Sequence, residues 1–497
     1  MLNVLIFLPL FVAFILLGLK NKNTIKFLSL IASAVILLLN LALFLKYTKG
    51  YAFEYQLQSA TNSLLNYHIG VDSIALILML LCSLMVFLSF LCLKIRHKGI
   101  FVSLFVLEFA IMGLFSALDA LLFYVFWEFS LLPLIYIIGL HSKDYKAGVK
   151  FFLYAFAGSI LMLVAMIYLA FLNHQVLNIW TFDLIVWQEH ISAPEFGVQI
   201  WLFLAFFVAF AIKSPLFPFH TWAPKVYAYS PTTASVMLVA FKMAPFGFLR
   251  FCLPLFPDAS VFLMPFIFAL CVVSILYTAF IAYRADDLKE LIAYSSISHI
   301  GVMLLGIFSL NVFGLTGAIF YMFAHGLVTG ALFIMASILR SRYGTLKISY
   351  HKALASKGAL FAALFAIVLF ASISLPLTIS FVGEFLVLLG VAKINFIYAL
   401  LAGLVIILGA IYMLSVFRKM FFMGEESHVS RFTLKTREII GLSIVVILIF
   451  YLGISPSVFL NPIEANVNEL LNIMQLKATD QASIEFLSDL KDMSHAK

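Results

Sequence analysis

Ionisable side chains recur inside long apolar stretches of this sequence, where they could carry protons. They are Glu108, Glu128, Lys213, His220, Lys242, His299, His325 and Glu384. A charge buried in a bilayer costs roughly 2.5–3.5 kcal/mol on insertion scales, so each of these residues is by default a functional hypothesis. A carboxylate and an ammonium group on neighbouring helices reduce that cost by pairing. A pair that opens and closes can take up and release a proton, so these residue types indicate an ion pathway.

Structural roles are the alternative for each of these residues. Glu128 and Lys213 could simply hold two helices together, although an apolar pair would do so at lower cost. His299 and His325 could form neutral hydrogen bonds between helices. For three secondary candidates a cap, a local pair or an interfacial position is a strong alternative: Glu108, His220 and Lys150. Asp72, at the start of an apolar stretch, is expected to be a helix cap.

The elements that hold these residues must suit a membrane. Of the 497 residues, 64% are hydrophobic and 11% are charged, and the mean hydropathy is +1.12. Apolar stretches of about 18 residues or more recur, and each can cross roughly 30 Å of hydrocarbon as a helix. Only helices and closed barrels span lipid, and these stretches lack the alternation of barrel strands. The expected fold class is therefore an all-α integral membrane bundle.

About fourteen spans are expected from the lengths of the apolar stretches. Their ranges are 2–19, 27–46, 72–93, 100–118, 119–139, 150–172, 199–220, 231–252, 260–283, 291–309, 312–339, 358–389, 395–417 and 437–454. The expected units are 1–99 with three helices, a first repeat 100–252, a second repeat 260–421, a last helix within 422–461 and a polar tail 462–497. For the tail we expect a short surface helix at 463–475 and then frayed chain.

The distribution of basic residues gives the orientation. Most of the 31 Lys and Arg fall in alternate loops, whereas the loop 173–199 contains none. Cytoplasmic loops carry an excess of these residues. We therefore expect a multi-pass protein of a bacterial inner membrane with both termini on the outer, periplasmic side.

Prolines interrupt two of the long spans. Pro215 and Pro218 lie in one, and Pro376 lies in the other. Proline removes a backbone donor, and irregular backbone at membrane depth is tolerated only inside protein or beside a water-filled cavity. The two breaks lie in the seventh and twelfth expected spans, so the two sets of helices have opposite orientation. Paired broken helices in inverted repeats, here the fourth to eighth and ninth to thirteenth spans, are typical of a transport site.

Five motifs resemble those of the antiporter-like membrane subunits of respiratory complex I. They are residues 126–128 (FWE), 212–222 (IKSPLFPFHTW), 288–301 (LKELIAYSSISHIG), 324–326 (AHG) and 381–385 (FVGEF). The likeness extends over about residues 70–455. Glu384, where related subunits usually carry a lysine, is similar to the M-type branch, the counterpart of the mitochondrial subunit 4.

The resemblance implies proton translocation driven by quinone reduction elsewhere in the complex. It implies an input pair of Glu128 and Lys213, a central Lys242, connecting residues His299 and His325, and a terminal group Glu384. The segment 235–242 is two residues shorter than is usual in the family. Either the start of the helix absorbs this difference or Lys242 faces in a different direction. We expect the first, with Lys242 in the middle of its span.

No cofactor motif is present in the sequence. There is no GxGxxG, Walker, metal-cluster or haem-attachment pattern, and the four cysteines lie apart in apolar stretches. The resemblance therefore places flavin, iron–sulfur clusters and quinone in other subunits, so this chain would serve a redox-driven translocase without redox chemistry of its own. It implies L- and N-type neighbours, lipids and transported protons as partners.

Two other functions remain open on the sequence. The first is a subunit of an Mrp-type Na⁺(K⁺)/H⁺ antiporter, which the same bundle and buried lysines would serve. The second is a non-conducting membrane scaffold, which should have no need for buried charges in two matched halves. The dispersed basic residues argue against nucleic acid as a partner.

Overall fold

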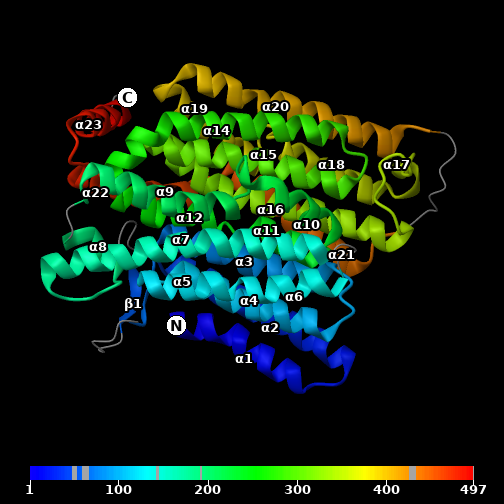
Figure 1. The fold of residues 1–497 in the computed structure, drawn as a ribbon. Helices are drawn as coiled ribbons and strands as arrows, with labels where there is room; N and C mark the ends of the chain where they lie inside the picture. The colour runs from blue at the N-terminus through cyan, green and yellow to red at the C-terminus, as the bar shows by residue number, and fades with distance from the viewer. Residues whose placement is uncertain (48–52, 59–65, 142–144, 191–192, 425–432, 496–497) are drawn as a thin grey trace.

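The computed structural model describes residues 1–47, 53–58, 66–141, 145–190, 193–424 and 433–495 (Figure 1). Long helices run alongside one another and form one bundle, which confirms the predicted all-α membrane class. Short polar side chains start many of these helices by accepting hydrogen bonds from the first turn. The capping residues are Asn21, Asp72, Asp119, Asp287, Asn311 and Asn395. The expected cap at Asp72 is confirmed, since its carboxylate accepts from the Ala75 amide at 2.8 Å.

The first unit contains three helices and a small hairpin. Its elements are α1 (Leu2–Gly18), α2 (Lys22–Lys46), β1 (Glu54–Gln58), β2 (His68–Val71) and α3 (Ser73–Cys92). The two strands pair antiparallel. Helix α3 is buried along nearly its whole length, because α2, α4 and α16 pack around it.

The first expected repeat is built from broken helices. Its elements are α4 (Lys98–Ser116), α5 (Ala120–Phe129), α6 (Leu131–His141), α7 (Tyr145–Leu177), α8 (Leu184–His190), α9 (Phe196–Lys213), η1 (Phe219–Trp222), α10 (Ala223–Tyr229), α11 (Thr232–Ala240), α12 (Met243–Gly247), η2 (Phe248–Cys252) and α13 (Leu253–Leu255). The expected span 119–139 is divided at Ser130. Pro133 explains this division, because it has no N–H to donate to the Phe129 carbonyl.

The second expected repeat and the last span follow. The elements are α14 (Pro257–Arg284), α15 (Leu288–Phe308), α16 (Val312–Tyr343), α17 (Leu354–Lys357), α18 (Ala359–Ser372), α19 (Ile379–Ile394), α20 (Phe396–Phe417), η3 (Arg418–Phe422) and α21 (Thr436–Ile454). Helix α16 is buried along most of its length and packs along both α15 and α19.

Helices occupy every position at which a span is expected. Within the described residues, 12 helices are long and apolar enough to cross a membrane, and Leu2–Gly18 and Ala359–Ser372 are shorter apolar helices. The second of these continues beyond its break into α19. Both proline breaks are confirmed, because α9 ends at Lys213 and α18 ends at Ser372. The division into two inverted repeats stays a prediction from the spacing of these breaks.

Loops that the sequence assigns to the same side of the membrane lie at the same end of the bundle. Figure 1 shows β1, α8, α22 (Ser457–Lys477) and α23 (Gln481–His495) at one end, and α17 at the opposite end. The first group belongs to segments that the sequence places on the outer side. Helix α17 belongs to a basic loop that the sequence places on the cytoplasmic side.

The tail is more ordered than the sequence suggests, and the expectation of a short helix followed by frayed chain is wrong. Apolar residues of α22 recur at helical spacing and are buried against α3, α13 and α16: Phe459, Ile463, Val467, Leu470 and Met474. Asp258 at the start of α14 then accepts hydrogen bonds from the backbone and hydroxyl of Thr479. These contacts fix the turn into α23.

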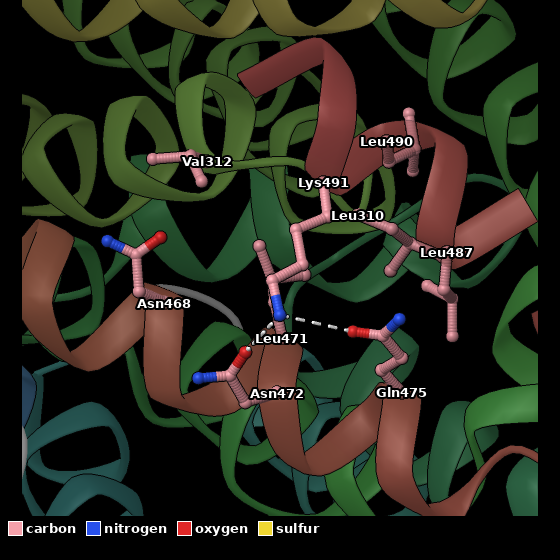
Figure 2. Close-up of a pocket in the computed structure, with 9 residues that line it drawn as sticks. All are labelled: Leu310, Val312, Asn468, Leu471, Asn472, Gln475, Leu487, Leu490 and Lys491. Atoms are coloured by element: carbon pink, nitrogen blue, oxygen red, sulfur yellow. Dashed lines mark hydrogen bonds between the residues drawn. The ribbon is translucent and has the colours of Figure 1, made fainter. Parts of the chain in front are cut away.

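A groove of ≈ 210 Å³ lies between the two tail helices and the Leu310–Val312 turn. Figure 2 shows Lys491 of α23 reaching across it, where its Nζ donates to Asn472 at 3.2 Å and to Gln475 at 3.4 Å. None of the candidate path residues lines this groove, so it forms part of the packing of the tail.

Candidate functional site

Lys213 lies at the end of α9, where the helix stops. Pro215 and Pro218 follow it, and neither can continue the ladder of backbone hydrogen bonds. The Lys213 Nζ is buried and has no hydrogen-bond partner among the described residues. It lies 4.9 Å from the ring centre of Trp127 and 5.9 Å from that of Phe151. Aromatic faces attract a cation, so these rings stabilise the ammonium without locking it in one place.

Glu128 lies on α5 next to this lysine. The carboxylate of Glu128 and the Lys213 ammonium interact electrostatically, but no direct ion pair joins them in the described structure. The neighbour of the carboxylate on α7 is Ser159. The structure thus brings the two expected partners together and leaves a gap between them.

Lys242 lies at a helix break that was not expected, although Pro245 has no N–H to donate to the Phe241 carbonyl. Helix α11 ends at Ala240, and Lys242 has a non-helical backbone (φ −86, ψ 40) before α12 begins at Met243. The expected span 231–252 is therefore interrupted at Lys242, and absorption of the short spacing by the start of the helix stays a prediction. The interruption lies at the lysine itself, which directly precedes α12. Its Nζ lies 2.9 Å from His325 Nδ1.

A row of hydrogen-bonding groups continues from this histidine. The rings of His325 and His299 have centroids 6.0 Å apart. The Tyr321 hydroxyl lies 2.7 Å from His299 Nδ1 and 3.5 Å from Glu384 Oε2. The Lys242–Glu384 row, as we name Lys242, His325, His299, Tyr321 and Glu384, therefore joins four helical elements, α12, α15, α16 and α19.

A small cavity lies beside the two histidines. Its volume is ≈ 10 Å³, and polar lining residues include Ser295, Thr329 and Ser380 besides His299 and His325. This is about the volume that one water molecule needs. The Nε2 atoms of both histidines are buried without a hydrogen-bond partner among the described residues. A water in this cavity would have polar groups on several sides.

Glycines allow the helices of the row to approach closely. A Cβ added at Gly383 would lie 2.7 Å from the Tyr321 Cβ and 2.9 Å from its Cα. A side chain at this position would therefore push α19 away from α16. The glycine directly before Glu384 is thus what allows this carboxylate to reach Tyr321.

The secondary candidates lie outside the row. Glu108 on α4 is fully buried, and neither carboxylate oxygen has a hydrogen-bond partner in the part of the chain that the structure describes. His220 in η1 packs against the rings of Phe217 and Tyr277. Lys150 on α7 donates to the Thr221 carbonyl at 3.3 Å at an exposed position.

Tyr321 is the residue that sequence reasoning missed. It lies four residues before His325 on α16, so the two side chains share one face of the helix. This four-residue spacing from a candidate histidine could have identified Tyr321 from the sequence. A tyrosine in an apolar stretch is weaker evidence for a functional role than a charged residue, because tyrosine also packs well without any chemical role.

Comparison with known proteins defines the class. The family described as NADH:quinone oxidoreductase/Mrp antiporter, TM, matches residues 117–411. The chain therefore belongs to this family of membrane proteins.

Individual relatives narrow the class further. The NADH-quinone oxidoreductase subunit M of Rickettsia prowazekii is 37% identical over 422 residues, which cover 82% of this chain and 84% of that protein. The NADH-ubiquinone oxidoreductase chain 4 of Chondrus crispus is 38% identical over 487 residues, covering 94% and 96%. A chain of respiratory complex I from Thermus thermophilus with bound NADH superposes with a TM-score of 0.86 at 32% identity, covering 95% and 99%. These similarities confirm the predicted likeness to the M-type branch and favour it over the Mrp-type alternative.

Proposed function

We propose that this chain is the proton-translocating, M-type membrane subunit of a respiratory NADH–quinone oxidoreductase. The observation that carries the proposal is the buried Lys242–Glu384 row, in which consecutive groups lie within hydrogen-bonding distance or one small cavity apart. A row of exchangeable groups through an otherwise apolar interior has little structural advantage, because apolar side chains would fill the same space at lower cost.

In this proposal Glu128 and Lys213 load the proton. The gap between the two groups allows the ammonium to move towards the carboxylate or away from it, and either movement changes the affinity of the other group for a proton. The proton then reaches Lys242 and follows the row to Glu384. The two helix breaks, at Lys213 and at Lys242, allow these side chains to change direction.

The redox partners of this function lie outside the chain. The proposal places flavin, iron–sulfur clusters and quinone in other subunits, and L- and N-type subunits and lipids against this bundle. It places both termini on the outer side of a bacterial inner membrane. The gathering of β1, α8 and the tail at one end of the bundle supports this orientation (Figure 1).

Replacing Lys213 with alanine tests the loading step. The Lys213→Ala complex is expected to assemble. Its rates of proton pumping and quinone reduction should fall about tenfold or more, because the ammonium group of the loading pair is absent. Pumping is measured as acidification of inverted membrane vesicles, and assembly as subunit composition of the purified complex.

The matched control for this test is Lys225→Ala. Lys225 is an exposed lysine on the nearby helix α10, so its removal should leave pumping unchanged. An assembled Lys213→Ala complex that pumps as well as the Lys225→Ala complex would contradict the proposed path.

A further inference from the structure

Tyr321 connects the second histidine of the row to its terminal carboxylate. We propose that the Tyr321 hydroxyl passes protons between His299 and Glu384, and that Ser374 holds the carboxylate in place to receive them. This inference rests on the proposed function, since it requires protons to move along the row. It assigns a role to two residues whose types are not ionised at neutral pH.

The position of Tyr321 suits this role. Its side chain is 2% exposed, so bulk solvent has little access to the hydroxyl. The 2.7 Å distance to His299 Nδ1 is a normal hydrogen bond, and the 3.5 Å distance to Glu384 Oε2 is long. A movement of the hydroxyl or the carboxylate by about 1 Å would give both contacts normal length.

Each histidine contacts one outer neighbour in the row through its Nδ1 atom. Lys242 faces Nδ1 of His325, whereas Tyr321 faces Nδ1 of His299. Neither Nε2 atom has a hydrogen-bond partner among the described residues, and both histidines line the small cavity. A proton that enters His325 at Nδ1 can leave from Nε2, and one that enters His299 at Nε2 can leave from Nδ1. Each imidazole thus uses both of its nitrogens.

The transfer through Tyr321 balances without ionising the tyrosine. A doubly protonated His299 gives its Nδ1 proton to the tyrosine oxygen, and the same oxygen gives its own proton to Glu384 Oε2. The His299 Nδ1–H and Tyr321 O–H bonds break, and new O–H bonds form on Tyr321 and Glu384. A cationic imidazole and a carboxylate become neutral, and the tyrosine ends as it began. The Tyr321 hydroxyl then rotates, so that its oxygen can again accept a proton from His299 and its own proton again points towards Glu384.

Ser374 fixes the acceptor. Its hydroxyl donates to the same oxygen, Glu384 Oε2, that Tyr321 reaches. Ser374 lies in the break between α18 and α19 with a left-handed backbone (φ 55), which places its side chain against the carboxylate. Glu384 Oε1 has no hydrogen-bond partner among the described residues. Ser374 is therefore a positioning residue, which keeps Oε2 directed towards Tyr321.

Tyr412 offers a matched control. It is a second fully buried tyrosine near Glu384, on α20, and its hydroxyl hydrogen-bonds Ser295 at 2.8 Å. No hydrogen bond joins it to either histidine or to Glu384 in the described structure. Tyr412→Phe thus removes a buried hydroxyl from the same region without breaking the row.

The experiment compares Tyr321→Phe, Tyr412→Phe and Ser374→Ala in inverted membrane vesicles that contain the assembled complex. Quinone-reductase turnover and its solvent deuterium isotope effect are measured together with pumping. Tyr321→Phe is expected to lower turnover and pumping about tenfold and to raise the isotope effect, because proton transfer becomes rate-limiting. Ser374→Ala should lower turnover and pumping and raise the isotope effect by smaller factors, and Tyr412→Phe should change none of the three.

Two outcomes would overturn the inference. One is a Tyr321→Phe complex with turnover, pumping and isotope effect equal to those of Tyr412→Phe. If Tyr321→Phe does not assemble, an unchanged isotope effect and turnover in Ser374→Ala would overturn it instead. Should Lys213→Ala still abolish pumping in either case, the proposed function stands and only the tyrosine link fails. Full pumping in Lys213→Ala contradicts the proposed function itself.

Discussion

Replacing Lys242 with methionine is expected to abolish proton pumping by the assembled complex. Lys242 is 3% exposed and lies at the centre of the path, where its Nζ contacts His325 Nδ1 at 2.9 Å. Methionine has a similar length and flexibility but carries no proton. Loss of a positioned proton-transfer group lowers rates about 10²–10⁴-fold, so turnover coupled to pumping should fall at least about a hundredfold. Acidification of inverted vesicles and NADH-driven quinone reduction measure this directly.

Lys289→Met controls for the removal of a buried lysine. Lys289 on α15 is 1% exposed and donates to the Ser230 carbonyl at 2.5 Å, away from the row. Its replacement should reduce the amount of assembled complex but not the pumping per assembled complex. If Lys242→Met pumps as well per complex as Lys289→Met, the contact between Lys242 and His325 is structural.

Removing the charge of Asp72 is expected to cause the largest loss of stability. Arg250 Nη2 lies 2.9 Å from Asp72 Oδ2, and both side chains are buried. Breaking a buried ion pair by removing one partner costs about 3–5 kcal/mol, because the other charge is left unpaired. Asp72→Asn keeps an oxygen to cap α3, whereas Asp72→Ala also loses the cap, worth about 1 kcal/mol more. The temperature at which the detergent-solubilised complex loses this chain should therefore fall in the order wild type, Asn, Ala.

A double variant separates the charge from the packing. Asp72→Asn combined with Arg250→Met leaves no unpaired charge, so it should recover part of the stability that Asp72→Asn loses. A double variant that is less stable than either single variant would show that packing of the arginine against Phe53 and Phe246, rather than its charge, dominates this site.

The spans and the proline breaks could be predicted from the sequence because their causes are local. A long apolar stretch determines a span, and Pro215, Pro218 and Pro376 interrupt their helices wherever the helices pack. The ionisable candidates were visible for the same reason, since a charge in an apolar stretch stands out. The cap at Asp72 follows from its position before the first turn of α3.

The contacts between distant segments could not be predicted in the same way. The break at Lys242 is the exception, because its cause is local and was overlooked: Pro245 has no N–H to donate to the Phe241 carbonyl. His325 is 83 residues from Lys242 along the chain, and nothing in the spacing of two single residues encodes their contact. The order of the tail likewise depends on Asp258, far from Thr479 in sequence.

Proton pumping by Glu128→Gln in inverted membrane vesicles tests the account most directly, with assembly of the complex checked alongside. Glutamine keeps the size of the side chain next to Lys213 and removes the group that takes up the proton. We expect an assembled complex in which pumping and quinone-reductase turnover collapse together. An assembled complex that pumps at the wild-type rate would show that the two charges only hold helices together, and would contradict the proposed path.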